Sequence, residues 1–260
     1  MRIFATVYPV ADLARNVGGG LVQVDWAIEI GQRPQSVAVT SDIRQKLSLA
    51  DAVLSNGLDE PWAIAPFEDV SQAPRLIRLD SLRSTRGHPV AGYLWLDPVI
   101  AKECVTEFAD RLSLLRPEKE NADLFKRNAE RTNAAIDGLL EEMLPKLRSG
   151  APTRVVTLSR DFTPLLKRLG IREARPVEID VPWIGDDEAR AIRAGAREGA
   201  VDFMVISADL PPAVARDWAQ RTGLKIIALD AMGSSAETGR HTYLELMRFN
   251  LQQLAGETEP

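Results

Sequence analysis

Metal-binding and cross-linking side chains are scarce in this sequence, which has one cysteine and two histidines among 260 residues. A single cysteine excludes an internal disulfide, and Cys104 lies in an amphipathic stretch where a free cysteine is usually a core residue. Zinc sites are built from histidine, cysteine and carboxylate side chains. With His88 and His241 alone, the sequence excludes a site of three histidines.

Features of a membrane span, a nucleic-acid site or a catalytic site are also missing. No apolar run is long enough to cross a bilayer. The net charge is −5 and the lysines and arginines are scattered, so a basic face for a nucleic acid is not expected. There is no nucleophile elbow and no phosphate-binding loop, and the glycines at 18–20 follow a predicted helix rather than precede one. We therefore predict that the protein is not an enzyme and uses no cofactor.

What is present is an alternation of strand and helix patterns in two halves. Hydrophobic residues make up 45% and charged residues 27%, as in a globular protein with a substantial core. In the first half the patterns predict strands at 2–7, 21–28, 51–55 and 75–79, and helices at 9–17, 41–48 and 98–115. In the second half they predict strands at 153–158, 176–180, 202–207 and 225–229, and helices at 161–169, 186–198, 211–221 and 238–254. This alternation is typical of mostly parallel sheets with helices on both faces.

A long helix is predicted between the two halves, at 117–147, because its apolar residues recur at helical spacing. Its length would be roughly 45 Å. We expect Pro145 to fray or kink its last turn, and Ser149 to Pro152 to end it. The predicted fold is α/β, with two lobes at 1–115 and 150–260, a rigid linking helix at 116–149, and a ligand cleft between the lobes.

A set of motifs along the whole chain resembles the periplasmic zinc/manganese solute-binding proteins of ABC transporters. These motifs are YPVADLA at 8–14 with Gly18-Gly19, ADAVLSNGL at 50–58 with Glu60-Pro61-Trp62, WLDP at 95–98, Leu229-Asp230, and YLELMRFN at 243–250. The resemblance implies a two-lobed fold, a small-molecule solute, a membrane permease as partner, and a monomer. It also implies an extracytoplasmic location, with an export signal or lipid anchor absent from this sequence; the alternative is a cytosolic protein.

The resemblance also implies four metal-ligand positions. Three are histidines in relatives, but here they are Gln35, Tyr93 and Ser159; the fourth is an aspartate, and Asp230 is in place. An amide, a phenol and a hydroxyl are weak zinc ligands and suit a hydrogen-bonded organic solute or a chelate better. Carboxylates elsewhere leave a hard-ion oxygen site open.

Four more residues are candidates for the cleft. Arg160 follows Ser159 at a predicted helix start, where free N–H groups and the helix dipole favour an anion; alternatively Ser159 or Asp161 caps the helix and Arg160 is solvated. Trp26 and Trp183 could stack on a planar ligand or be core residues. His88 is either a remnant ligand at the cleft or a solvated loop residue.

These observations lead to three hypotheses. The first is the solute-binding component of an ABC importer that binds a small polar or anionic organic solute, or a metal chelate. The second is zinc or manganese binding through a rebuilt site with Asp230, Gln35 and His88. The third is a non-transporting interaction protein with a degenerate cleft.

Overall fold

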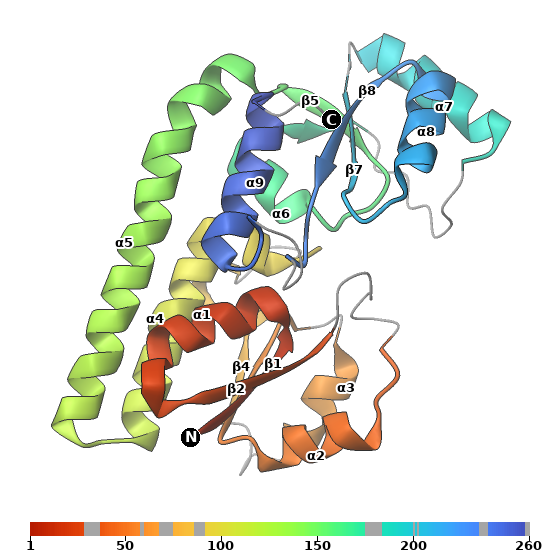
Figure 1. The fold of residues 1–260 in the computed structure, drawn as a ribbon. Coiled ribbons are helices and arrows are strands. Elements are labelled where there is room, and N and C mark those ends of the chain that lie inside the picture. The colour runs from red at the N-terminus through yellow and green to blue at the C-terminus, as the bar shows by residue number, and fades with distance from the viewer. Residues whose placement is uncertain are drawn as a thin grey trace. The chain divides into compact units, whose positions relative to one another are not determined.

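The computed structural model describes residues 1–28, 37–57, 60–67, 75–85, 92–174, 184–199, 201, 203–233 and 239–257 (Figure 1). Gln35, His88, Trp183 and the predicted strand at 176–180 lie outside these residues. The chain divides into two compact units. The first comprises Met1–Val90, Leu94–Leu139 and Met232–Glu245, and the second comprises Ala91–Tyr93, Leu140–Ala231 and Leu246–Pro260.

The first unit is built on a parallel sheet of four strands in the order β2-β1-β3-β4. The strands are β1 (Arg2–Val7), β2 (Gln23–Ile28), β3 (Ala52–Ser55) and β4 (Leu76–Arg78). In the central register, Ala5 of β1 lies between Trp26 of β2 and Leu54 of β3. Five of the six residues of β1 are buried, as expected for a central strand of a parallel sheet.

The helices of this unit are α1 (Tyr8–Gly18), α2 (Ser41–Leu49), α3 (Pro61–Ile64), α4 (Pro98–Leu115) and the part of α5 (Lys119–Gly150) up to Leu139. Helix α1 packs on β1 and β2 and against α4, while Ile43 and Leu47 of α2 pack with Phe4 and Val53 of the sheet. Two predicted helix caps are confirmed. The Thr40 hydroxyl accepts the N–H of Ile43 at 3.2 Å, and Asp97 accepts that of Val99 at 2.8 Å.

The second unit repeats the design with strand order β6-β5-β7-β8, again parallel. Its strands are β5 (Arg154–Thr157), β6 (Arg172–Glu173), β7 (Phe203–Ser207) and β8 (Lys225–Leu229). Its helices are α6 (Thr163–Arg168), α7 (Asp186–Gly199), α8 (Pro212–Thr222) and most of α9 (Tyr243–Ala255). Ile192 of α7 and Trp218 of α8 belong to one core with Met204 of β7.

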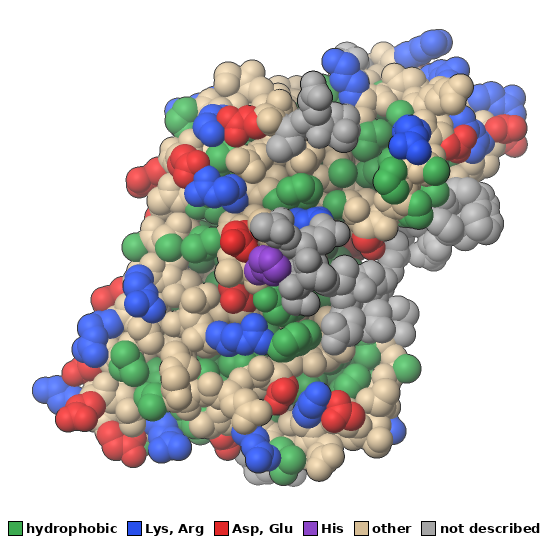
Figure 2. All heavy atoms as spheres, in the orientation of Figure 1, with side chains coloured by type: hydrophobic (Ala, Val, Ile, Leu, Met, Phe, Trp, Pro, Cys, Tyr) green, Lys and Arg blue, Asp and Glu red, His purple; other side chains and the backbone are tan. Residues whose placement is uncertain are grey.

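The predicted α/β class, with two lobes of parallel strands, is confirmed. Most predicted elements are present, with ends displaced by a few residues. Three differ more: helix α3 and strand β6 were not predicted, and α9 begins at Tyr243 rather than near 238. Among the helices that the structure describes, none has the length and apolar character that a bilayer-spanning helix requires. On the face seen in Figure 2, acidic and basic side chains are intermingled rather than gathered by sign.

Candidate functional site

Tyr93 and the segment after β5 are held together in the second unit. The backbone N–H of Tyr93 donates to the carbonyl of Asp161 at 3.0 Å. Gly92 has a positive φ of 80°, and a Cβ placed on it would overlap the carbonyl oxygen of Arg160. This close approach requires a glycine and brings Tyr93 to the Ser159–Asp161 turn. We expected Tyr93 to be carried by the first lobe, but its contacts group it with the second unit.

The Ser159–Asp161 turn is not a helix start, so this part of the sequence prediction is wrong. Helix α6 begins at Thr163, with Phe162 as its N-cap residue and Pro164 in its first turn. Proline favours that position because it lacks the N–H that a first turn leaves unbonded. The Ser159 hydroxyl instead accepts the N–H of Asp161 at 3.4 Å, and Arg160 is exposed. The segment thus presents a hydroxyl and a guanidinium, without the N–H array of a helix end.

Glu173 supports this turn and was missed by sequence reasoning. Its Oε1 accepts hydrogen bonds from the hydroxyls of Thr157 and Thr163, both at 3.0 Å. These bonds tie the last residue of β5 to the first residue of α6, on either side of the turn. Strand β6 has two residues, which is too short to give a periodic pattern in the sequence. The sequence therefore offered no signal for this role of Glu173.

Asp230 directly follows β8 and is buried. Its backbone is held by the side chain of Asn250, a fully buried residue of α9. The N–H of Asp230 donates to Asn250 Oδ1, and Asn250 Nδ2 donates to the carbonyl of Asp230, both at 2.7 Å. Tyr93, Ser159, Arg160 and Asp230 therefore all belong to the second unit.

Trp26 lies in the first unit, where other side chains engage its ring. The Arg15 guanidinium lies 4.7 Å from the Trp26 ring centroid and 5.5 Å from that of Tyr8. The two rings meet edge to face at 5.3 Å. These are cation–π and aromatic contacts within the unit. The Tyr8 hydroxyl also donates to the carbonyl of His241.

A buried carboxylate, Asp12, lies beside this cluster and joins α1 to the start of α9. It accepts the N–H of Tyr243 at 2.8 Å and the side-chain amide of Asn16 at 3.3 Å. Burial raises the pKa of Asp12, and Glu245 acts in the same direction, whereas the Tyr243 bond, Arg15 and Asn16 oppose the shift. Asp12 is one of the motif residues that carried the resemblance. In the structure its role is to connect helices α1 and α9.

The described part of the chain holds one cysteine, one histidine and many carboxylates that could serve as metal ligands. Within it, no group of three histidine, cysteine, aspartate or glutamate side chains is arranged to hold a metal ion. Burial raises the pKa of the Cys104 thiol to about 12, which keeps it protonated and a poor ligand. His241 is partly exposed, and its N–H donates to Glu245, which caps α9.

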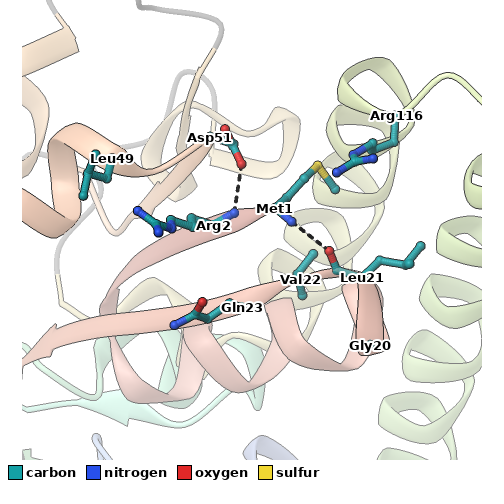
Figure 3. Close-up of a pocket in the computed structure, with 9 residues that line it drawn as sticks. All are labelled: Met1, Arg2, Gly20, Leu21, Val22, Gln23, Leu49, Asp51 and Arg116. Carbon is teal, nitrogen blue, oxygen red and sulfur yellow. Dashed lines mark hydrogen bonds between the residues drawn. The ribbon is translucent and has the colours of Figure 1, made fainter.

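A hollow of about 620 Å³ lies at the amino ends of β1 and β2 in the first unit (Figure 3). The Met1 ammonium donates to the Leu21 carbonyl at 3.0 Å, and the Arg2 N–H donates to Asp51 at 2.8 Å. None of the predicted site residues lines it. Ligands of parallel α/β sheets bind at the opposite, carboxyl ends of the strands. We therefore do not assign this hollow as the site.

Two units, each a parallel four-stranded sheet flanked by helices, define a two-lobed α/β protein. The family described as zinc-uptake complex component A, periplasmic, matches residues 3–257, and the chain belongs to this family.

Relatives are similar over nearly the whole chain. The manganese ABC transporter substrate-binding lipoprotein PsaA of Streptococcus mitis is 22% identical, covering 98% of this chain and 88% of that protein. A cadmium-bound periplasmic metal binding protein from candidatus Liberibacter asiaticus has a TM-score of 0.81 at 20% identity, with 98% of both chains covered. The metal-dependent lipoprotein YcdH from Bacillus subtilis has a TM-score of 0.79 at 18% identity and the same coverage. At these identities the structural likeness establishes the fold alone.

Proposed function

We propose that this protein is the extracytoplasmic substrate-binding component of an ABC importer and that it captures a small polar or anionic organic solute, or a metal chelate. The family and the names of the relatives support the transport role and a membrane permease as partner. The ligand class rests on this chain's own residues. Tyr93, Ser159, Arg160 and Asp230 are the proposed contacts, with Trp26, Gln35, Trp183 and His88 as further candidates.

The observation that carries the ligand class is the set of side chains at the family's ligand positions. The resemblance to the family implies that Tyr93 and Ser159 occupy positions that are histidine in relatives, and a phenol and an aliphatic hydroxyl bind zinc weakly. The same groups donate and accept hydrogen bonds, which orient organic ligands in pockets. Arg160 adds an exposed cation next to Ser159, and Asp230 adds an acceptor.

The relatives favour a second candidate function, because they are named as manganese transport and metal-binding proteins. A site rebuilt around Asp230, Gln35 and His88 would offer one carboxylate, one amide and one imidazole. Hard cations accept the carboxylate and amide oxygens, but they usually require several oxygen ligands. The third possibility, an interaction protein with a degenerate cleft, predicts that no small molecule binds.

Native mass spectrometry of freshly purified protein and titration calorimetry with zinc and manganese distinguish these functions. We expect a co-purifying organic solute or chelate, and weak binding or none for the bare ions. Submicromolar, stoichiometric zinc binding that is lost in Asp230→Ala would establish the metal function instead. Absence of any bound species would support the degenerate cleft.

Arg160→Ala tests the role of the exposed cation. Losing one charge-assisted hydrogen bond costs about 1.5–3 kcal/mol, which corresponds to roughly a tenfold to hundredfold loss of affinity for the solute that co-purifies. Arg172→Ala is the matched control, because Arg172 is an exposed arginine of the same unit on β6. An unchanged dissociation constant in Arg160→Ala, with the fold intact by circular dichroism, would remove Arg160 from the site.

A further inference from the structure

Asp230 lies where the hydrogen bonding of the second sheet ends. Leu229 is the last residue of β8 and pairs with Ser207 of β7, and its carbonyl accepts the N–H of Ala208 at 2.7 Å. Beyond Leu229 the buried backbone groups need partners from elsewhere, since an unbonded buried N–H or carbonyl is costly. The side chain of Asn250 supplies both partners for Asp230.

This pair of bonds constrains orientation more than a single bond would. One planar amide accepts from the Asp230 N–H and donates to the Asp230 carbonyl, each at 2.7 Å. The N–H and the carbonyl of Asp230 are therefore both held by one rigid amide group. Fixing both ends fixes the direction of the Cα–Cβ bond, and with it the cone in which the carboxylate can lie.

The position of Asn250 on its helix also points to this role. Leu246, Met247, Leu251 and Leu254 form the buried stripe of α9, and Asn250 lies within that stripe at 0% exposure. A polar side chain at such a position destabilises a core unless its hydrogen bonds are made. Here they are made to the backbone of Asp230, which the resemblance implies as a ligand position.

We propose that Asn250 is a positioning residue that orients the Asp230 carboxylate for solute capture. The inference rests on the proposed function, because it takes Asp230 as a solute contact. Asn250 touches no solute itself; it acts through the backbone of Asp230. A role limited to closing the end of β8 would predict lower stability without a change in the carboxylate's orientation or in binding.

The test compares Asn250→Leu with Asn128→Leu. Asn128 is a matched control, because it is also a buried asparagine whose amide donates to a backbone carbonyl, that of Val17 at 2.9 Å, but it lies in the first unit. Residual dipolar couplings of the Asp230 Cα–Cβ bond report its direction by NMR without any ligand. We expect the same couplings in the wild type and in Asn128→Leu, and changed couplings in Asn250→Leu, where the two backbone bonds that fix this direction are lost.

Binding is measured in parallel with citrate as an organic anion, zinc citrate as a chelate and zinc sulfate as the bare ion. For any probe that binds the wild type, Asn250→Leu should weaken binding by about tenfold or more, and Asn128→Leu should leave it unchanged. If Asn250→Leu does not fold, Asn250→Gln keeps the amide but displaces it by one methylene, and should also change the Asp230 couplings.

Unchanged Asp230 couplings in the folded Asn250 variants would overturn the proposal, as would unchanged affinity for a probe that binds the wild type. Failure of the proposed function gives a different result. In that case none of the probes binds the wild type and no solute co-purifies, while the couplings still decide whether Asn250 orients Asp230.

Discussion

Asp12 is a buried carboxylate whose titration should make the stability of the fold depend on pH. It caps the start of α9 through the N–H of Tyr243, and α9 is further capped by Thr242 and Glu245 in a reciprocal capping box. Because burial raises its pKa above the ordinary value of 3.8, the folded state holds the Asp12 proton more tightly than the unfolded state does. The contribution of Asp12 to the free energy of unfolding is fully present below pH 3.8, and it is lost as the pH rises through the folded-state pKa of Asp12.

Asp12→Asn removes this titration but keeps an oxygen that can accept the N–H of Tyr243. We expect the stability of the wild type relative to Asp12→Asn to decline as the pH is raised from about 3 to about 7. Urea denaturation of both proteins across this range measures the difference and cancels the titration of the other carboxylates. If the free energies of unfolding of the two proteins changed in parallel with pH, the raised pKa of Asp12 would be contradicted.

Gly92 is the residue whose replacement should most directly disturb the candidate site. A side chain there is strained by the positive φ of 80° and would overlap the Arg160 carbonyl. Gly92→Ala should therefore destabilise the protein by about 1–3 kcal/mol and displace Tyr93 from the Ser159–Asp161 turn. Gly20→Ala is the control, since nothing lies within 4 Å of a Cβ at Gly20. Equal urea midpoints for the two variants would show that the turn adapts without cost.

Among the elements, α5 ends at Gly150, within the stretch from Ser149 to Pro152 where its end was predicted. Pro145 was expected to fray or kink the last turn, and the helix continues past it. The Ser149 hydroxyl donates to the carbonyls of Pro145 at 3.4 Å and Lys146 at 3.0 Å. A Cβ on Gly150 would overlap the carbonyl of Ala255 in α9, so the end of the helix is set by a close approach in the second unit.

Gly138 gives a prediction for the middle of α5. It lies inside the helix, and no atom is within 4 Å of a Cβ placed on it. Gly138→Ala should stabilise the protein by about 0.5–1 kcal/mol, because alanine loses less backbone entropy in a helix than glycine. An increased urea midpoint with unchanged solute binding is the expected result. A decreased midpoint would mean that this part of the helix must bend.

At the scale of the whole molecule, the continuity of α5 leads to a prediction about motion on ligand binding. The helix has 32 residues, roughly 48 Å in length, and it runs unbroken through residues 139 and 140, where the chain passes from the first unit to the second. A continuous helix offers no obvious hinge. We expect X-ray scattering to give nearly the same radius of gyration for the free protein and for protein loaded with its co-purifying solute. A clear compaction on loading would contradict this expectation.

Local signals were sufficient for much of the fold. Strand β8 spans the predicted 225–229, and the caps at Thr40 and Asp97 act as predicted. In each case the controlling interactions lie within a few residues of sequence, or arise from an apolar run that must be buried. Asp230 and Ser159 were singled out differently, as positions that the resemblance to the family implied.

Long-range packing decided the rest. The two-residue strand β6 exists because β5 pairs with it, and Tyr93 joins the second unit because Gly92 fits against the Arg160 carbonyl. The bonds between Asn250 and Asp230 join residues 20 positions apart on different elements. The sequence by itself determined the alternation of strands and helices, because that follows from short-range periodicity and capping. The tertiary structure alone decided which side chains hold the candidate site, because those contacts form between elements that no local pattern brings together.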